Sequence, residues 1–358
     1  MKLCQRYLMR EVLAAVLLVL LAFLVLFAFF NFLDELRSVG RESYDLLRAA
    51  AFVALGLPSL IYELIPIATL IGALFALSNL ARHSEITVLR ASGMATRDLL
   101  LILFRVAGLL AVLTFLLGET VVPMTERWAQ EIRAQALSKA IVQQGLVSGL
   151  WIKDGRNFIN IRKAMPDARL EGVRVYHFSD DNQLSSVMDA KRARFEPPGV
   201  WHLDEVVTTT LDGERTAIRK SEGELWQSAV NPDLLAVLMV APERMSLFSL
   251  LSFTRHLADN RQKTDRYEIA IWKKVIYPLS ILVMVALALP FGYSHDRVGG
   301  VSLRIFAGVM LGIVFYALNG LFSNLGVINA WPPLASALAP SGLFFLGAVG
   351  LMWWVERR

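Results

Sequence analysis

The chain has 358 residues, of which 55% are hydrophobic, with a formal net charge of +5 and one cysteine. This composition excludes a disordered or disulfide-rich protein and indicates a polytopic membrane protein that carries one soluble domain. The basic residues form no block of like charge and no G-K dipeptide occurs, so the sequence gives no sign of nucleic-acid binding or of a Walker A nucleotide site.

The first predicted element is a membrane span from Val12 to Phe30, a run without charge or proline. At about 1.5 Å per residue, its length nearly matches the roughly 30 Å hydrocarbon layer of a bilayer. Because basic residues precede it, a cleaved signal peptide is the alternative. The run is longer than an ordinary signal sequence, however, and no A-x-A-like site follows it. We therefore predict a retained span.

Five further apolar runs have the length of a membrane span. They lie at Leu60–Leu80, Leu99–Gly118, Val275–Gly292, Ser302–Phe322 and Pro333–Val355. The predicted organisation is three spans in residues 1–119, a water-exposed insertion in residues 120–267 and three spans in residues 268–358.

The basic residues of the short loops predict the orientation of this arrangement. They gather at the N-terminus, between spans two and three, between spans four and five, and at the C-terminus. These places share one side of a six-span chain, and the positive-inside rule makes that side the cytoplasm. We therefore expect both termini inside and the insertion outside.

The cytoplasmic loop between spans two and three is predicted to contain a short helix, about residues 82–93. Ser84 can cap it, Ile86 and Leu89 give it an apolar stripe, and Gly93 can end it. One interpretation is an interfacial helix that lies on lipid headgroups. The other is a coupling helix seated in a groove of a cytosolic motor, where the stripe would fill the groove and Glu85 would pair with a basic residue.

The insertion has the pattern of an all-β domain with helical connectors. Turn signals, such as Asp154-Gly155 and Asp212-Gly213 between strand-like segments, recur at roughly ten-residue intervals and favour a sandwich or barrel. Helices are expected at Met124–Ala140 and Ser246–Tyr267, where they would join the domain to spans three and four.

Two features of the spans indicate packing or lipid contact. Phe23, Phe27 and Phe30 share one side of the first span, and Arg37 and Arg41 follow just outside it. One interpretation is contact with a specific lipid through an apolar wall and a basic rim. Alternatively, the aromatic rings face bulk lipid and the arginines pair with nearby acidic residues. In the fifth span, a G-x-x-x-G motif from residue 308 to residue 312 predicts a close helix contact.

Short segments in chain order resemble the LptF/LptG family of lipopolysaccharide-export permeases. They are Arg6-Tyr7-Leu8, Ser43-Tyr44-Asp45, the Ser84–Gly93 stretch, Gly149-Leu-Trp-Ile-Lys-Asp-Gly155, and Trp272 with Pro278. Their order across six spans and a β domain makes the resemblance specific. Ser-Tyr-Asp and Leu-Trp-x-Lys-Asp-Gly are more similar to the LptG branch than to the LptF branch.

The resemblance implies a polytopic α-helical membrane protein with six transmembrane helices and an inserted periplasmic all-β, jellyroll-like domain. It also implies a multi-pass location in a Gram-negative inner membrane, beside an LptF-like second permease and on an LptB-like cytosolic ATPase dimer. That ATPase would hold ATP and magnesium, so this chain would bind no cofactor and catalyse no reaction. Lipopolysaccharide would be extracted from the membrane and passed to an LptC-like single-span protein and an LptA-like periplasmic bridge.

The resemblance also implies functional residues. Glu85 corresponds to the coupling-helix carboxylate that meets the ATPase, and Arg133 matches a basic position at the base of the β domain. The predicted coupling residues are Ser84, Glu85, Ile86, Leu89, Arg90 and Gly93. The predicted lipid-binding residues are Phe27, Phe30, Asn31, Arg37, Arg41 and Arg133. The basic cluster is thinner than in some relatives, which carry lysine at the positions of Asn31 and Ser38.

Two other function classes remain as alternatives. An autonomous secondary transporter of lipid-like substrates is expected to show inverted repeats and paired broken helices, and the sequence shows no such symmetry. A membrane-anchored scaffold fits the topology but does not need a capped cytoplasmic helix. An intramembrane enzyme would need a metal motif or a nucleophile with a placed base, and the sequence offers neither.

Overall fold

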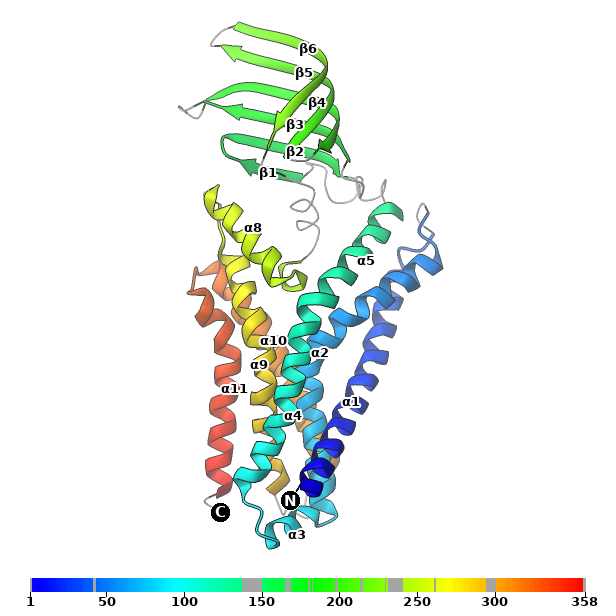
Figure 1. Cartoon of the computed structure of the whole chain (residues 1–358), viewed down its shortest axis with the longest axis vertical. Helices are drawn as coiled ribbons and strands as arrows, with labels where there is room; N and C mark the ends of the chain where they lie inside the picture. Colours follow the sequence, from blue (N-terminus) through cyan, green and yellow to red (C-terminus); the bar gives the residue numbers. More distant parts are fainter. Residues whose placement is uncertain are drawn as a thin grey trace.

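The computed structural model describes residues 2–40, 43–136, 150–164, 169–179, 181, 183–196, 199–212, 215–228, 230, 241–260, 262–293 and 301–356. Within these residues, six helical spans are long and apolar enough to cross a membrane. A six-stranded antiparallel sheet is inserted between the third and the fourth span (Figure 1). The predicted fold class, six transmembrane helices with an inserted all-β domain, is confirmed.

The helices extend well past the apolar runs. Their bounds are α1 Lys2–Leu36, α2 Leu46–Arg82, α4 Thr96–Leu116, α9 Asp265–Tyr293, α10 Val301–Ile328 and α11 Pro333–Glu356. The third span continues beyond α4 through a π-helical turn, η1 Leu117–Val121, into α5 Val122–Ala136. The helical connector predicted before the β domain is therefore the direct continuation of span three.

Three short helices complete the helical part of the described residues. They are α3 Glu85–Ala91, η2 Pro242–Arg244 and α8 Leu247–Asp259. Ser246 caps α8 as predicted, because its hydroxyl accepts a hydrogen bond from the Ser249 N–H at 3.1 Å. The prediction of one helix from Ser246 to Tyr267 is wrong at its centre. The backbone N–H of Asn260 bonds to the His256 carbonyl at 3.2 Å and ends α8, and α9 begins at Asp265.

Helix α2 is the centre of the bundle. It packs against α1, α5, α9 and α10, and 67% of its most apolar window is buried, compared with 17% for α1 and for α10. Glycines make the close contacts possible. A Cβ atom on Gly72 would lie 2.5 Å from the Val16 Cα atom of α1, and one on Gly312 would lie 2.6 Å from Ile67 of α2. The close helix contact predicted for the G-x-x-x-G motif is confirmed, and its partner is α2 of the same chain.

The inserted sheet is a meander in which each strand pairs with the next. The strands are β1 Leu150–Asp154, β2 Asn157–Ala164, β3 Arg169–Phe178, β4 Leu184–Glu196, β5 Val200–Asp212 and β6 Arg215–Gln227. The hairpin predicted at Asp154-Gly155 is confirmed by the pairing of Asp154 with Asn157 and by a φ of 59° at Gly155. The second predicted hairpin falls partly outside the described residues at Gly213, although Asp212 pairs with Arg215 beside it.

The sheet bends around its own core. In β5, Leu203 and Val206 are both buried although residues three apart point to opposite faces of a regular strand. Glu205 between them has a φ of 53°, and Gly172 on β3 has a φ of 66°. These left-handed residues let the strands turn a corner, so that one curved sheet encloses Trp201 and its neighbours (Figure 1).

The sheet and the short helix α3 lie at opposite ends of the molecule. The sheet stands beyond one end of the helical bundle, with β1 nearest to the helices, and α3 lies at the opposite end with the N- and C-terminal ends of the chain (Figure 1). A hydrogen bond from the Gly155 N–H to Asn260 Oδ1, 2.7 Å long, connects the β1–β2 turn to the end of α8.

Candidate functional site

The short helix α3 is held between two residues with left-handed backbone. Gly93, with a φ of 93°, follows the helix, and the Met94 N–H reaches back to the Leu89 carbonyl at 3.1 Å, as in a Schellman motif. Gly93 thus ends the helix as predicted. Ser84 precedes it and its carbonyl accepts the Val88 N–H at 3.0 Å, but its φ of 59° differs from the extended backbone of an ordinary N-cap.

The apolar stripe of α3 faces the bundle of its own chain. Ile86 is 5% exposed within the helical core, and Leu89 packs against the same core. The bundle of this chain therefore buries Ile86 and covers part of Leu89, and the expectation that the stripe fills a groove in a partner stays a prediction. Val88, which is 65% exposed, is the apolar side chain that α3 leaves open.

The carboxylate of Glu85 has a partner that the sequence did not reveal. The Tyr7 hydroxyl, near the beginning of α1, lies close enough to the Glu85 side chain for the two groups to interact electrostatically. This contact joins α3 to the first membrane helix. Tyr7 belongs to the Arg6-Tyr7-Leu8 segment, whose resemblance to the family was the one feature of the sequence that pointed to this residue. Arg90 lies on α3, but its side chain is outside the part of the chain that the structure describes.

The aromatic residues of α1 form an open wall on its outer half. Phe27 is 41% exposed, Phe30 is 52% exposed, and Asn31 is exposed beside them. The Phe27 ring is 6.3 Å from that of Phe23, and the Phe30 ring is 6.1 Å from that of Phe29. The structure thus brings the predicted apolar residues together on a surface without a partner among the described residues.

The predicted basic rim is largely paired within the chain. Arg37 lies 3.7 Å from Asp34, and both side chains are exposed. The Nε atom of Arg133 lies 3.7 Å from the Glu35 carboxylate, and the guanidinium carbon is 5.1 Å from the centre of the Phe52 ring. The remaining predicted arginine, at position 41, lies outside the described residues.

Glu35 is the nearly buried acidic partner in this rim, with a side chain that is 9% exposed. The Tyr44 hydroxyl donates to it at 2.8 Å, and Tyr44 is itself buried. Burial first, and the bond to Glu35 second, raise the pKa of Tyr44 well above its usual range. Arg133 therefore balances a buried carboxylate at the α1–α2 turn.

A buried network of charges, not predicted as a site, joins span three to the segment that returns from the sheet. Glu119, in the π-helical turn, accepts the Leu247 N–H at 3.0 and 2.9 Å. The Lys274 ammonium of α9 lies 3.5 Å from the Glu119 carboxylate and also donates to the Met245 carbonyl. Gly118 makes room for this turn, because a Cβ atom there would lie 2.7 Å from the Tyr62 ring.

Arg244 of η2 forms the second half of the network. Its guanidinium lies 3.0 Å from Glu126 of α5 and 3.8 Å from Glu63 of α2. The Ser59 hydroxyl and the Gln130 amide donate to Glu126 at 3.2 and 3.1 Å. Burial alone would lower the pKa of Arg244, but the carboxylates of Glu126 and Glu63 raise it. The segment after the sheet is thus fixed to α2 and α5 by charge-assisted contacts.

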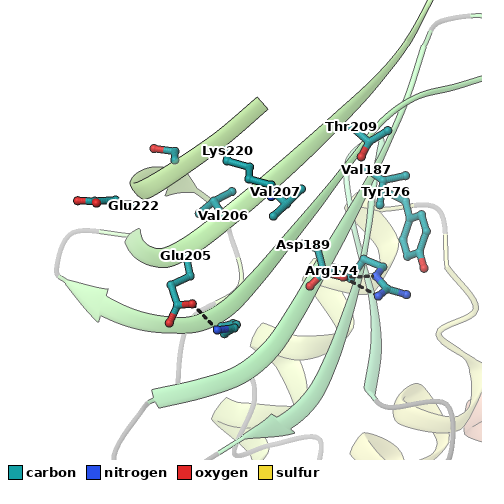
Figure 2. Close-up of a pocket in the computed structure, with 12 residues that line it drawn as sticks. Arg174, Tyr176, Val187, Asp189, Glu205, Val206, Val207, Thr209, Lys220 and Glu222 are labelled. Carbon is teal, nitrogen blue, oxygen red and sulfur yellow. Dashed lines mark hydrogen bonds and ion pairs between the residues drawn. The ribbon is translucent and has the colours of Figure 1, made fainter. Parts of the chain in front are cut away.

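The structure also has two hollows, one beside this network and one on the sheet. One of about 220 Å³ lies beside the network, between α2, η2, α9 and α10. The other, of about 850 Å³, lies over strands β3 to β6 and is shown in Figure 2. In the second hollow Arg174 donates to Asp189 at 2.8 Å, and Lys191 is bonded to Glu205 (Figure 2). These cross-strand pairs satisfy one another and stabilise the register of the sheet.

Comparison with known proteins places these features in a family. Residues 6–354 match the family model described as lipopolysaccharide export system permease LptF/LptG. The permease protein LptG of Escherichia coli K12 is 33% identical over 353 residues, 97% of each chain, and LptG of Haemophilus influenzae is 30% identical over 99% of this chain and 98% of its own. LptF of E. coli K12 is 26% identical over 143 residues, 40% of this chain and 38% of its own. The chain therefore belongs to the LptF/LptG family of lipopolysaccharide export system permeases.

Proposed function

We propose that this chain is the LptG-type permease subunit of an ATP-driven exporter, which extracts lipopolysaccharide from the inner membrane and passes it to a periplasmic bridge. The chain itself is not an enzyme, and an LptB-like ATPase dimer binds and hydrolyses ATP. The observation that carries the proposal is the placement of Glu85. Its carboxylate lies on a short helix that is anchored in the bundle by Ile86, and it is close to the Tyr7 hydroxyl of α1. A push on α3 would therefore reach the membrane helices directly.

The charges and the positions of the chain ends support an orientation for this proposal. The end that carries α3 and both chain ends is the cytoplasmic end, because the basic loop residues gather there. The sheet at the opposite end is then periplasmic, where an LptC-like protein and an LptA-like bridge would receive the lipid. The charged network around Glu119 and Arg244 would hold the periplasmic sheet to the membrane helices.

The second permease and the lipid would occupy the exposed sides of α1 and α10. Both helices pack against α2, and in each the most apolar window is 17% buried although it is apolar enough to cross a membrane. Phe27, Phe30 and Asn31 would form the wall for acyl chains. Arg37, Arg41 and Arg133 would lie at the phosphate level, where a lipid phosphate would compete with Asp34 and Glu35 for the first and last of them.

The test is to purify the chain from its native membrane in mild detergent and to identify the bound proteins and lipids by mass spectrometry. We expect an ATPase, a second six-span permease and lipopolysaccharide. The variant Glu85→Gln removes the charge and keeps the shape. It should either lose the ATPase or hydrolyse ATP without releasing lipopolysaccharide to the periplasmic acceptor.

The matched control is Tyr7→Phe, which removes the intramolecular partner of Glu85 and leaves its charge. If Glu85 acts on the motor, Tyr7→Phe should keep the ATPase bound and coupled to lipopolysaccharide release, whereas Glu85→Gln should lose either the ATPase or the coupling. An equal loss in both variants would mean that Glu85 serves to hold α1. A chain that purifies alone with bulk phospholipid, and does not respond to either variant, would contradict the proposal and favour a scaffold or an autonomous transporter.

A further inference from the structure

The small cavity between α2, η2, α9 and α10 lies beside the charged network and reaches the side of α10 that no described residue of this chain covers. Its volume is about 220 Å³. On the α10 side it is lined by Tyr316, which is 61% exposed, and by Gly320, which is also exposed. The exposed apolar residues Met310, Ile313 and Val314 precede them on the same helix. A headgroup in the cavity could thus keep its acyl chains on α10.

Most charges around this cavity have partners. Arg244 is shared between Glu63 and Glu126, and Lys274 is held by Glu119. Lys273 and Glu243 also line the cavity and attract each other, and Lys273 also attracts Glu63, but no hydrogen bond or ion pair within 4.0 Å fixes either side chain among the residues that the structure describes. One ammonium and one carboxylate therefore face the same cavity without a direct contact.

The balance of charge selects the class of ligand. Four carboxylates, those of Glu63, Glu119, Glu126 and Glu243, surround three cations, those of Arg244, Lys273 and Lys274. A purely anionic group would add to this negative excess, and a metal cation would meet the Lys273 ammonium. A group that carries both charges could contact both Lys273 and Glu243 directly without changing the balance.

Neutral groups in the cavity complete the polar lining. The hydroxyl of Tyr62 has no hydrogen-bond partner among the described residues, and its ring is fixed against Gly118 and 5.3 Å from the Tyr277 ring. Asn319 donates its amide N–H to the Phe315 carbonyl at 3.1 Å, which leaves its side-chain oxygen as an acceptor. A phosphate beside Lys273 and Tyr62 and an ammonium beside Glu243 and Asn319 would use all four groups.

We propose that this cavity is a binding site for a phosphoethanolamine headgroup, with the phosphate on Lys273 and the ammonium on Glu243. The headgroup can belong to a glycerophospholipid of the surrounding leaflet or to a lipopolysaccharide that bears phosphoethanolamine. The proposal depends on the cavity and its charges and does not require that the chain exports lipopolysaccharide.

The test measures lipid binding by the complete, delipidated permease assembly in native mass spectrometry. Phosphatidylethanolamine, phosphatidylglycerol and inorganic phosphate are added separately. We expect the wild type to retain phosphatidylethanolamine, to retain phosphatidylglycerol at least roughly tenfold more weakly, and not to retain inorganic phosphate. Lys273→Gln and Glu243→Gln should each weaken phosphatidylethanolamine retention by roughly tenfold, because each loses one charge-assisted contact. Lys263→Gln, an exposed position outside the cavity, is the matched control and should bind as the wild type does.

A further arm identifies the source of the headgroup. Lipopolysaccharides with and without phosphoethanolamine are compared, and a Lys273-dependent preference for the modified form supports the same site with the substrate as its source. Equal retention of phosphatidylglycerol and phosphatidylethanolamine, or retention that neither variant changes, would overturn the proposal. If Lys273→Gln fails to fold, the exposed Glu243→Gln decides alone, with its melting temperature compared with that of the wild type.

Discussion

The Lys274 ammonium lies 3.5 Å from the Glu119 carboxylate, and that carboxylate also accepts the N–H of Leu247 at the start of α8. Span three, span four and the segment returning from the sheet therefore meet at one buried point. Because α8 contacts the β1–β2 turn through Asn260, this junction connects the membrane helices to the sheet. A movement of α9 relative to span three would be transmitted to the β domain.

The junction predicts a double-mutant result. Lys274→Met should lower stability by about 3–5 kcal/mol, because it leaves the Glu119 charge without its cation in a buried site. Glu119→Gln alone should also destabilise, since it weakens the cap on α8. The double variant should be more stable than the sum of the two losses predicts, and thermal unfolding in detergent measures this. Strictly additive losses would show that the two side chains are not coupled.

The α1–α2 contact predicts that Gly72 cannot be replaced. Gly72→Ala would place a Cβ atom 2.5 Å from the Val16 backbone, so the two helices must separate, at a cost of about 1–3 kcal/mol. Gly108→Ala is the matched control, because no atom lies within 4 Å of its Cβ position. The control should be neutral or stabilising in a thermal melt, since glycine is unfavourable in a helix interior. Equal behaviour of the two variants would contradict the close contact.

The arginines of the outer rim should differ in their effect on stability. Arg133→Gln removes the cation beside the nearly buried Glu35 and should cost about 1–3 kcal/mol. Arg37→Gln removes an exposed pair with Asp34, and its melting temperature should barely change because such pairs are screened by water. If lipopolysaccharide binding falls in both variants, the stability difference separates the structural role of Arg133 from lipid contact.

The left-handed backbone at Gly93, which ends α3, predicts an effect on the coupling of ATP hydrolysis to lipopolysaccharide release. Gly93 has a φ of 93° and open space at its Cβ position, so Gly93→Ala acts through backbone strain alone, at roughly 1–2 kcal/mol. We expect a lower rate of lipopolysaccharide release per ATP hydrolysed by the reconstituted assembly. Gly93→Asn is the control, because asparagine adopts left-handed backbone more readily. A larger loss with asparagine than with alanine would contradict the Schellman arrangement.

The existence of the main elements was predictable because each has a strong local signal. The spans are long uncharged runs, the Asp154-Gly155 turn fixes a hairpin, and Gly93 ends α3. The limits of the elements were less predictable. Helix α5 continues span three without a break, since a π-helical turn at Leu117–Val121 passes the chain from apolar to polar sequence. Asn260 ends one helix before α9 begins, and the cap-type residues Asn260 and Thr264 were the local signals of this break.

The candidate sites show the same division. Glu85 and Arg133 were found from short motifs, but their partners, Tyr7 and Glu35, lie on α1 and could not be paired by spacing. The stripe of Ile86 and Leu89 was correctly read as apolar. Periodicity shows which side of a helix is apolar and not what covers it, and in this chain the bundle itself covers Ile86 and part of Leu89.

The sequence by itself determined the six spans, the inserted β domain and the family. The length of an apolar run, the alternation of apolar residues and the order of the motifs can all be read along the sequence without knowing which residues meet in space. The tertiary structure decided which charges meet. Lys274 reaches Glu119 and Arg244 reaches Glu126 across more than one hundred residues, and Lys273 and Glu243 are left to share a cavity. Electrostatic energy depends on distance in space, so these pairings exist only after the helices and the sheet have packed.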